Sequence, residues 1–105
     1  MRGLVYRKAA VRDLEDIVDY VIRETGDLGA ASRLVDDLRR HCAKIAASPV
    51  VLGRPREELA PGLRGLLHGR YVIFFRCSDA QVEIVNILHS RRDLSSAIEP
   101  DDPIR

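Results

Sequence analysis

The stretch HGRYVIFFRCSDAQVEIVNILHSRRD, residues 68–93, decides the fold because it holds two apolar runs joined by a short polar turn. The runs at 71–77 and 82–89 are rich in β-branched and aromatic residues, and so brief a connection makes them antiparallel neighbours. A third run, 63–67, precedes a tight turn at Gly69, where glycine can adopt a positive φ. The sequence therefore predicts a three-stranded antiparallel meander.

Alternation along the 71–77 strand predicts what each face of the sheet contacts. One side is wholly apolar, and we assign it to the core beneath helices: Tyr71, Ile73, Phe75 and Cys77. The other side is apolar in the middle and cationic at both ends: Arg70, Val72, Phe74 and Arg76. Because one helical layer covers one face of a sheet, we interpret this second side as an exposed partner site. The alternative is that the first strand, the loop before residue 63 and the C-terminal tail cover it.

Two amphipathic helices precede these strands. Apolar residues recur at intervals of three and four from about Ala9 to Glu24, and again from Ala31 to Ala46. Gly26 ends the first helix, and Asp27 is available to cap the second. Helices joined by so few residues are antiparallel neighbours, which predicts a helical hairpin with one apolar seam.

The remaining segments complete the predicted fold. Residues 4–6 are a short strand candidate, and the loop at 48–62, rich in proline and glycine, has room for one helical turn at 57–59. We therefore expect one α+β domain over residues 1–105. It has an N-terminal strand and an antiparallel helical hairpin packed on a mainly antiparallel sheet that ends in the meander. An acidic tail follows from about residue 97.

The composition narrows the class of protein. A chain of 105 residues that is 46% hydrophobic supports one core, and a formal net charge of +1 gives no global field that would drive binding to nucleic acid. We expect no membrane association and a cytoplasmic location, with Cys42 and Cys77 as reduced thiols. The histidines and cysteines lack the paired spacing that zinc needs, so we expect no metal and no cofactor.

The order of these elements resembles the RelE/ParE superfamily of bacterial toxin–antitoxin modules, and the local motifs resemble its ParE branch. The motifs are A..DL.DI..Y in the first helix, GRPREELAPGLRGLLHGRYVIFFR at 53–76 and VEIVNILHSRRD at 82–93. The resemblance implies a growth-inhibiting protein of the bacterial cytoplasm, held inactive in a hetero-oligomeric complex by an antitoxin that wraps it. Operator DNA would be bound only indirectly, through the antitoxin.

The resemblance implies two classes of function. ParE-like members are associated with poisoning of DNA gyrase, whereas RelE-like members cut mRNA on the ribosome with a base, an acid and cations. The matching region offers one imidazole and several guanidinium groups: His89, Arg70, Arg76 and Arg91, with Arg92 beside them. No tyrosine follows Tyr71, and the only lysines, Lys8 and Lys44, lie in or beside the helices.

That set is incomplete for a nuclease, so we favour a gyrase inhibitor that is not an enzyme and is neutralised by a ParD-like antitoxin. One alternative is a ribosome-dependent mRNA interferase. The other is a non-toxic family member that acts only in the antitoxin complex.

The expected functional residues fall into two groups. We expect antitoxin to bind the second face of the sheet and the outer side of the hairpin, through Arg70, Val72, Phe74, Arg76 and Tyr20. We associate toxicity with the LH..RD ending, through His89, Arg91 and Arg92. For some of these residues the alternative is a purely structural role. In that alternative, His89 is a strand-end imidazole bonded to backbone, and the two arginines open a short helix at LSSAI. Tyr20 and Tyr71 are then packing residues.

Overall fold

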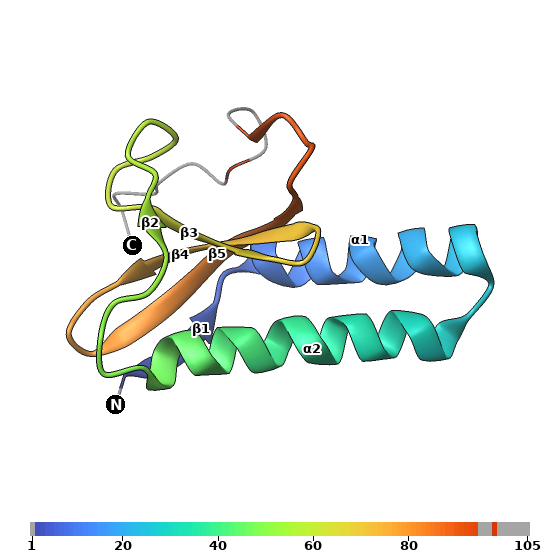
Figure 1. Cartoon of the computed structure of the whole chain (residues 1–105), viewed down its shortest axis with the longest axis horizontal. Coiled ribbons are helices and arrows are strands. Elements are labelled where there is room, and N and C mark those ends of the chain that lie inside the picture. The colour runs from blue at the N-terminus through green and yellow to red at the C-terminus, as the bar shows by residue number, and fades with distance from the viewer. Residues whose placement is uncertain (1, 95–97, 99–105) are drawn as a thin grey trace.

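A computed structural model describes residues 2–94 and residue 98, and it places two helices against one face of a five-stranded sheet (Figure 1). The elements along the chain are β1 (Gly3–Tyr6), α1 (Lys8–Thr25), α2 (Leu28–Ala47), β2 (Arg54–Pro55), β3 (Arg64–His68), β4 (Tyr71–Cys77) and β5 (Gln81–His89). The strand order in the sheet is β1-β5-β4-β3-β2. The predicted α+β fold is confirmed.

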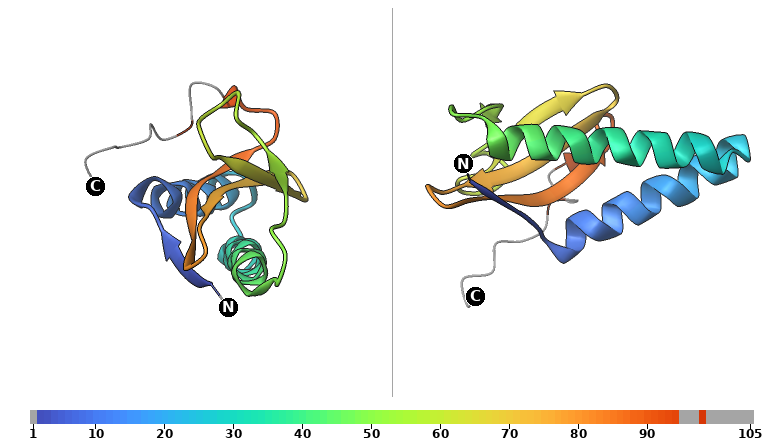
Figure 2. Two further views of the ribbon diagram at one scale, coloured as in Figure 1. Left: turned by 90° about the vertical axis from the view of Figure 1, so that its left-hand side faces the viewer. Right: turned by 90° about the horizontal axis from the view of Figure 1, so that it is seen from below.

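Local chemistry at two adjacent residues separates the helices. Gly26 adopts a φ of 68° and its N–H donates to the carbonyl of Ile22, which ends α1. The carboxylate of Asp27 accepts a hydrogen bond of 3.0 Å from the N–H of Ala30 and so caps α2. The predicted hairpin is confirmed, and its tip extends beyond the end of the sheet (Figure 2). No helix in the described part of the chain is both long and apolar enough to cross a membrane.

The sheet combines the predicted meander with two outer strands. β3, β4 and β5 are antiparallel neighbours, and Gly69 turns between β3 and β4 with a φ of 60°. β1 lies parallel to β5, with Gly3 opposite Gln81 and Tyr6 opposite Ile84. β2 pairs with the first two residues of β3 and was not predicted, because a two-residue strand that contains proline has no periodic signal.

The helices cover the face of β4 that the alternation assigned to them. Ile73 and Phe75 are fully buried in a core that also contains Leu14, Leu38 and Ile84. Tyr71 and Cys77 pack at the margin of this core. The assignment of this side to the helical layer is therefore confirmed.

The second face of the sheet is also buried, which corrects the prediction of an exposed partner site. Phe74 has no exposed surface and Val72 is 8% exposed. They belong to a second core with Ala60, Leu63, Val85, Leu88 and Ile98, flanked by Leu59 and Leu94. The cover comes from the loop before β3 and from residues after β5. These are two of the three segments that the alternative prediction named. β1 takes no part in it, because it lies at the edge of the sheet beside β5.

Arginine side chains attach this loop to the sheet. The guanidinium of Arg64 donates to the carbonyls of Leu52 and Gly53 at 3.0 and 2.9 Å. Nε of Arg76 donates to the carbonyl of Pro61 at 3.1 Å. The prediction that Arg76 flanks an exposed apolar patch is therefore wrong, because its side chain binds the loop that covers the patch.

The loop contains a turn at the place where the sequence predicted one helical turn. Residues 57–59 form a hydrogen-bonded turn, in which the N–H of Leu59 donates to the carbonyl of Arg56 at 3.0 Å. The guanidinium of Arg56 lies 5.8 Å above the ring centre of Phe74. This turn therefore forms part of the cover of the second face.

Candidate functional site

A cleft of about 360 Å³ opens where α1 passes the end of β5. Its walls come from α1, β4, β5 and the turn after β5: Asp13, Asp16, Ile17, Tyr20, Tyr71, Ile87, Leu88, His89 and Arg92. Three predicted site residues, Tyr20, His89 and Arg92, therefore share one cleft. They come from the two ends of the chain.

Asp13 fixes α1 to β5 at the floor of this cleft. Its carboxylate accepts a hydrogen bond of 2.8 Å from Nδ2 of Asn86 and one of 2.9 Å from the N–H of Ile87. Burial raises the pKa of Asp13 above its usual value, although these hydrogen bonds and the charge of Arg92 act in the opposite direction. Asp13 is not among the site residues that the sequence predicts, although a carboxylate on the apolar side of an amphipathic helix indicates a buried polar contact.

His89 is held by the backbone that follows it. Its Nδ1 accepts a hydrogen bond of 3.2 Å from the N–H of Arg91, which requires the neutral ring with its proton on Nε2. The ring packs edge-on against Tyr71, with 5.5 Å between the ring centres. Burial raises the pKa of the Tyr71 hydroxyl, so this group stays neutral. The structural reading of His89 as a strand-end imidazole bonded to backbone is confirmed.

Within the cleft, Tyr20 is 53% exposed. The other predicted site residues lie outside the cleft lining, and Arg70 is exposed at the β3–β4 turn. Arg91 is exposed, and it is not among the described residues that line the cleft. Val72 and Phe74 are in the second core, so the exposure on which their antitoxin role rested is absent. The predicted helix at LSSAI and the acidic tail lie outside the described residues, apart from Leu94 and Ile98.

The charges and walls of the cleft limit what it can bind. Ile17, Ile87 and Leu88 give it apolar walls. Asp13 and Asp16 place two carboxyl groups in it against the single guanidinium of Arg92, while the bonded tautomer of His89 is neutral. A phosphate backbone binds poorly where acids outnumber cations, whereas an apolar or basic side chain suits such a cleft.

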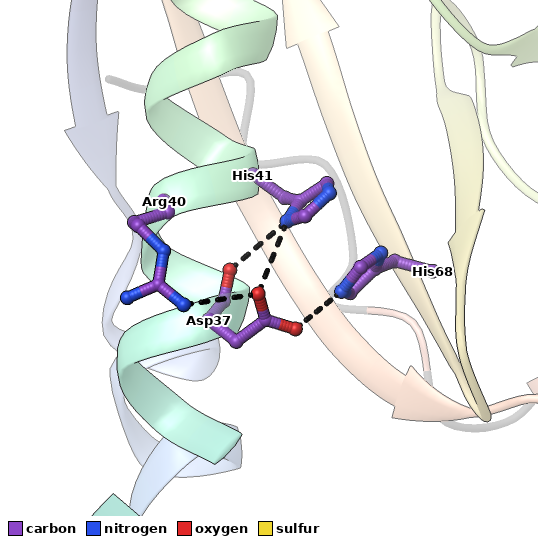
Figure 3. Close-up of polar contacts among 4 residues, drawn as sticks. All are labelled: Asp37, Arg40, His41 and His68. Carbon is purple, nitrogen blue, oxygen red and sulfur yellow. Dashed lines mark hydrogen bonds and ion pairs between the residues drawn. The ribbon is translucent and has the colours of Figure 1, made fainter. Parts of the chain in front are cut away.

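A second polar cluster, made of residues that do not line the cleft, joins α2 to β3 (Figure 3). Nε2 of His68 donates to Oδ2 of Asp37 at 2.5 Å, and Nδ1 of His41 donates to the carbonyl of Asp37 at 3.0 Å. The two imidazole rings stack, with 3.5 Å between their centres. The hydrogen bond from His68, supported by that from Arg40, lowers the pKa of Asp37.

Sequence reasoning missed this cluster because one of its members comes from a distant element. Asp37 and His41 are four residues apart, so they face the same side of α2, and this spacing was visible in the sequence. His68 ends β3 and joins them only through the packing of the sheet on the hairpin.

Comparisons with known proteins agree over most of the chain. Residues 4–94 match the family described as ParE toxin of type II toxin–antitoxin system, parDE. Toxin ParE1 from Mycobacterium tuberculosis strains CDC 1551 / Oshkosh and ATCC 25618 / H37Rv is 31% identical over 87 residues, 82% of this chain and 87% of that protein. A solved structure of the chromosomal ParDE toxin–antitoxin system from P. aeruginosa superposes with a TM-score of 0.73 at 25% identity. It covers 85% of this chain and 96% of that one.

Proposed function

This chain belongs to the ParE toxin family of type II toxin–antitoxin systems, and we propose that it inhibits DNA gyrase by binding and is neutralised by a ParD-like antitoxin. The observation that carries the proposal is the family match over residues 4–94, which spans both helices and nearly the whole sheet. The proposed setting is the bacterial cytoplasm, as for a toxin whose target is gyrase. Operator DNA would be contacted through the antitoxin.

The contents of the cleft favour inhibition by binding over cleavage of RNA. A nuclease needs a group that takes the 2′-hydroxyl proton and cations that stabilise the phosphorane. Here Nδ1 of His89 already accepts a backbone hydrogen bond, and the raised pKa of Tyr71 disfavours a phenolate base. Lys8 and Lys44 are exposed on the helices, and the cleft holds more acids than cations.

The same cleft supports a way for an antitoxin to neutralise the toxin. Tyr20 at the rim is a residue for which we expect antitoxin contact, and His89 and Arg92 are residues that we associate with toxicity. An apolar or basic antitoxin side chain in the cleft would cover all three at once. Neutralisation would then result from occlusion of the toxic surface, without any change in the toxin fold.

The test of the proposed activity uses one preparation of the purified chain in two assays. We expect loss of gyrase supercoiling or trapped cleaved DNA, with ribosome-bound mRNA left intact. Arg92→Ala should reduce the gyrase effect, while Arg23→Ala, a change of an exposed arginine in the last turn of α1, serves as the matched control.

The two alternatives give different results in these assays. Cleaved mRNA with normal supercoiling, abolished by His89→Ala, would replace the proposal with a ribosome-dependent interferase. Unimpaired growth on induction without antitoxin, together with normal supercoiling, would support a non-toxic member that acts only in the antitoxin complex.

The antitoxin arrangement is tested by the affinity of the cognate antitoxin. Tyr20→Ala should weaken binding by about tenfold or more if the ring is an anchor, because buried interface tyrosines often contribute this much. Val11→Ala changes an exposed α1 residue outside the cleft lining and is the control. Equal affinities for both variants would remove the cleft from the antitoxin interface.

A further inference from the structure

The cluster of Asp37, His41 and His68 has no part in the proposed toxin function, and its composition suggests a function of its own. It offers two imidazole rings and one carboxylate from two elements, and ligand atoms of the three residues lie within 4.8 Å of one another. The side chains are accessible without being fully solvated, with exposures of 26% for each histidine and 37% for Asp37.

The donor set is of a kind that binds transition-metal dications. Imidazole nitrogens with a carboxylate oxygen suit Zn²⁺ and its neighbours, whereas Mg²⁺ and Ca²⁺ prefer oxygen ligands. The spacing of Asp37 and His41, four residues apart on α2, places both on one side of the helix, and His68 approaches from the end of β3 (Figure 3).

The distances also fit a single ion. Bonds of about 2.0–2.1 Å from zinc place tetrahedral ligand atoms about 3.3 Å apart. Oδ1 of Asp37 lies 3.8 Å from Nδ1 of His41, and Oδ2 of Asp37 lies 2.5 Å from Nε2 of His68. These two distances involve different oxygens of the same carboxylate, and one ligand atom from each of the three residues lies within 4.8 Å of the other two. The three groups are therefore near the separation that one ion requires.

We propose that Asp37, His41 and His68 form a three-ligand site for a Zn²⁺-class cation, with solvent completing the coordination. Coordination replaces the two N–H bonds that now point at Asp37. The proton on Nε2 of His68 and the proton on Nδ1 of His41 pass to solvent or to the other ring nitrogen, and each nitrogen lone pair then binds the metal.

The bound ion would replace the hydrogen bond that now links β3 to α2 with metal–ligand bonds between the same elements. β2 pairs only with Arg64 and Gly65 of β3, and His68 lies at the other end of that strand. A bond from α2 through the metal to His68 attaches this end of the sheet to the hairpin. Because the ion binds the folded chain, it should raise the melting temperature with its concentration.

Arg40 allows a further test of the site, because it binds the carboxylate of Asp37. Its Nη2 donates to Oδ1 of Asp37 at 3.2 Å, and the side chain is 68% exposed. A cation there competes with the metal for the same carboxylate oxygen. Arg40→Gln removes that charge without removing a ligand, so it should tighten metal binding, whereas each ligand variant should weaken it.

The deciding experiment is calorimetric titration of the full-length purified chain with ZnCl₂ in a buffer that does not chelate metals. We expect one Zn²⁺ per chain. Affinity should fall by about tenfold or more in Asp37→Asn, His41→Gln and His68→Gln, since even loss of a residue that only supports a ligand typically costs 10–100-fold. The melting temperature should rise by about 10 °C at a Zn²⁺ concentration about 100 times the Kd.

The matched control is His89→Gln, which changes the remaining histidine of the chain and leaves the cluster intact. A second readout needs no variant: on Zn²⁺ titration the ring NMR signals of His41 and His68 should move and those of His89 should not. With Co²⁺, an absorption spectrum without a near-ultraviolet thiolate charge-transfer band would exclude Cys42 and Cys77 as ligands. Absent binding, equal loss in His89→Gln, or a thiolate band would each overturn the proposal.

Discussion

The two faces of β4 are both buried, but by different kinds of cover. Phe75 and Ile73 on one face lie under a capped helical hairpin, while Phe74 and Val72 on the other lie under an irregular loop and residues after β5. Adjacent residues of one strand thus enter two cores. Alternation along a strand therefore shows which residues share a face. It does not show which other segment of the chain covers that face.

The two covers are attached by different chemistry. The helical layer makes a broad apolar contact and adds the bonds of Asp13 to β5. The loop has few apolar residues and depends on guanidinium groups, with Arg64 bound to Leu52 and Gly53 and Arg76 bound to Pro61. An irregular segment satisfies only some of its carbonyls within itself, and here side chains of the sheet bind those of Leu52, Gly53 and Pro61.

The largest effects are expected at Phe74 and Phe75, one in each core. Both rings are fully buried, so Phe74→Ala and Phe75→Ala should each lower the free energy of unfolding by about 3–5 kcal/mol. Urea denaturation of the two variants measures this. If Phe74→Ala unfolded like the unmodified chain, the second face would not be a core in solution and the predicted exposed site would regain its support.

A smaller effect is expected at the point where the loop crosses the sheet. Gly53 has a φ of 75°, and a Cβ there would lie 2.7 Å from the carbonyl oxygen of Gly65 and 3.2 Å from Cζ of Phe75. Gly53→Ala should therefore cost about 2–3 kcal/mol, from the left-handed conformation and the backbone clash. Gly26→Ala, with a φ of 68° and open space around it, should cost only about 1 kcal/mol. Equal costs would show that the loop does not approach β3 this closely.

The attachment of the helical layer should be weaker than either core. Asp13→Ala leaves Nδ2 of Asn86 and the N–H of Ile87 without this acceptor, which should cost about 2 kcal/mol of unfolding free energy. Because burial raises the pKa of Asp13, the native chain binds its proton more tightly than the unfolded chain does. Its contribution to stability therefore decreases as pH rises above about 4.

Asp13→Asn removes this titration and keeps one acceptor oxygen, so it isolates the pH dependence. The free energy of unfolding of the unmodified chain, minus that of Asp13→Asn, should decrease as pH rises through the range above about 4. Denaturant titrations at several pH values measure the difference. An increase with pH would mean that the hydrogen bonds outweigh burial at this carboxylate.

The smallest effect is expected for Leu67, which strand pairing places on the second face but which is not part of the second core. Leu67 pairs with Val72 and so faces the same side, yet it is 64% exposed. Leu67→Ala should change the unfolding free energy by less than about 0.5 kcal/mol, as is usual for exposed substitutions. A cost comparable to that of Phe74→Ala would extend the second core to the end of β3.

The parts of the fold that the sequence predicted were those with local signals. The helix stripes, the cap at Asp27, the turn at Gly69 and the three strands of the meander each depend on residues close together in the chain. The cover of the second face was given only as the alternative, because Leu59, Ala60 and Leu63 follow no period and lie in a segment rich in proline and glycine. Its apolar residues were nevertheless present in the sequence.

The sequence predicted several residues of the candidate site, but not that they lie together in one cleft. Tyr20, His89 and Arg92 were named from the motifs, but their meeting depends on the packing of α1 against the end of β5. That packing is fixed by Asp13 across 74 positions of sequence to Ile87, which no local pattern encodes. The pairing of His68 with α2 was missed for the same reason.

The parallel pairing of β1 with β5 has a consequence for the order of synthesis. Gly3 is opposite Gln81 and Tyr6 is opposite Ile84, so the first strand of the chain has its partner only when the last strand has been made. Asp13 likewise waits for Asn86 and Ile87, and the cleft needs both. A nascent chain that has not yet released β5 therefore lacks the cleft that holds the proposed toxic surface.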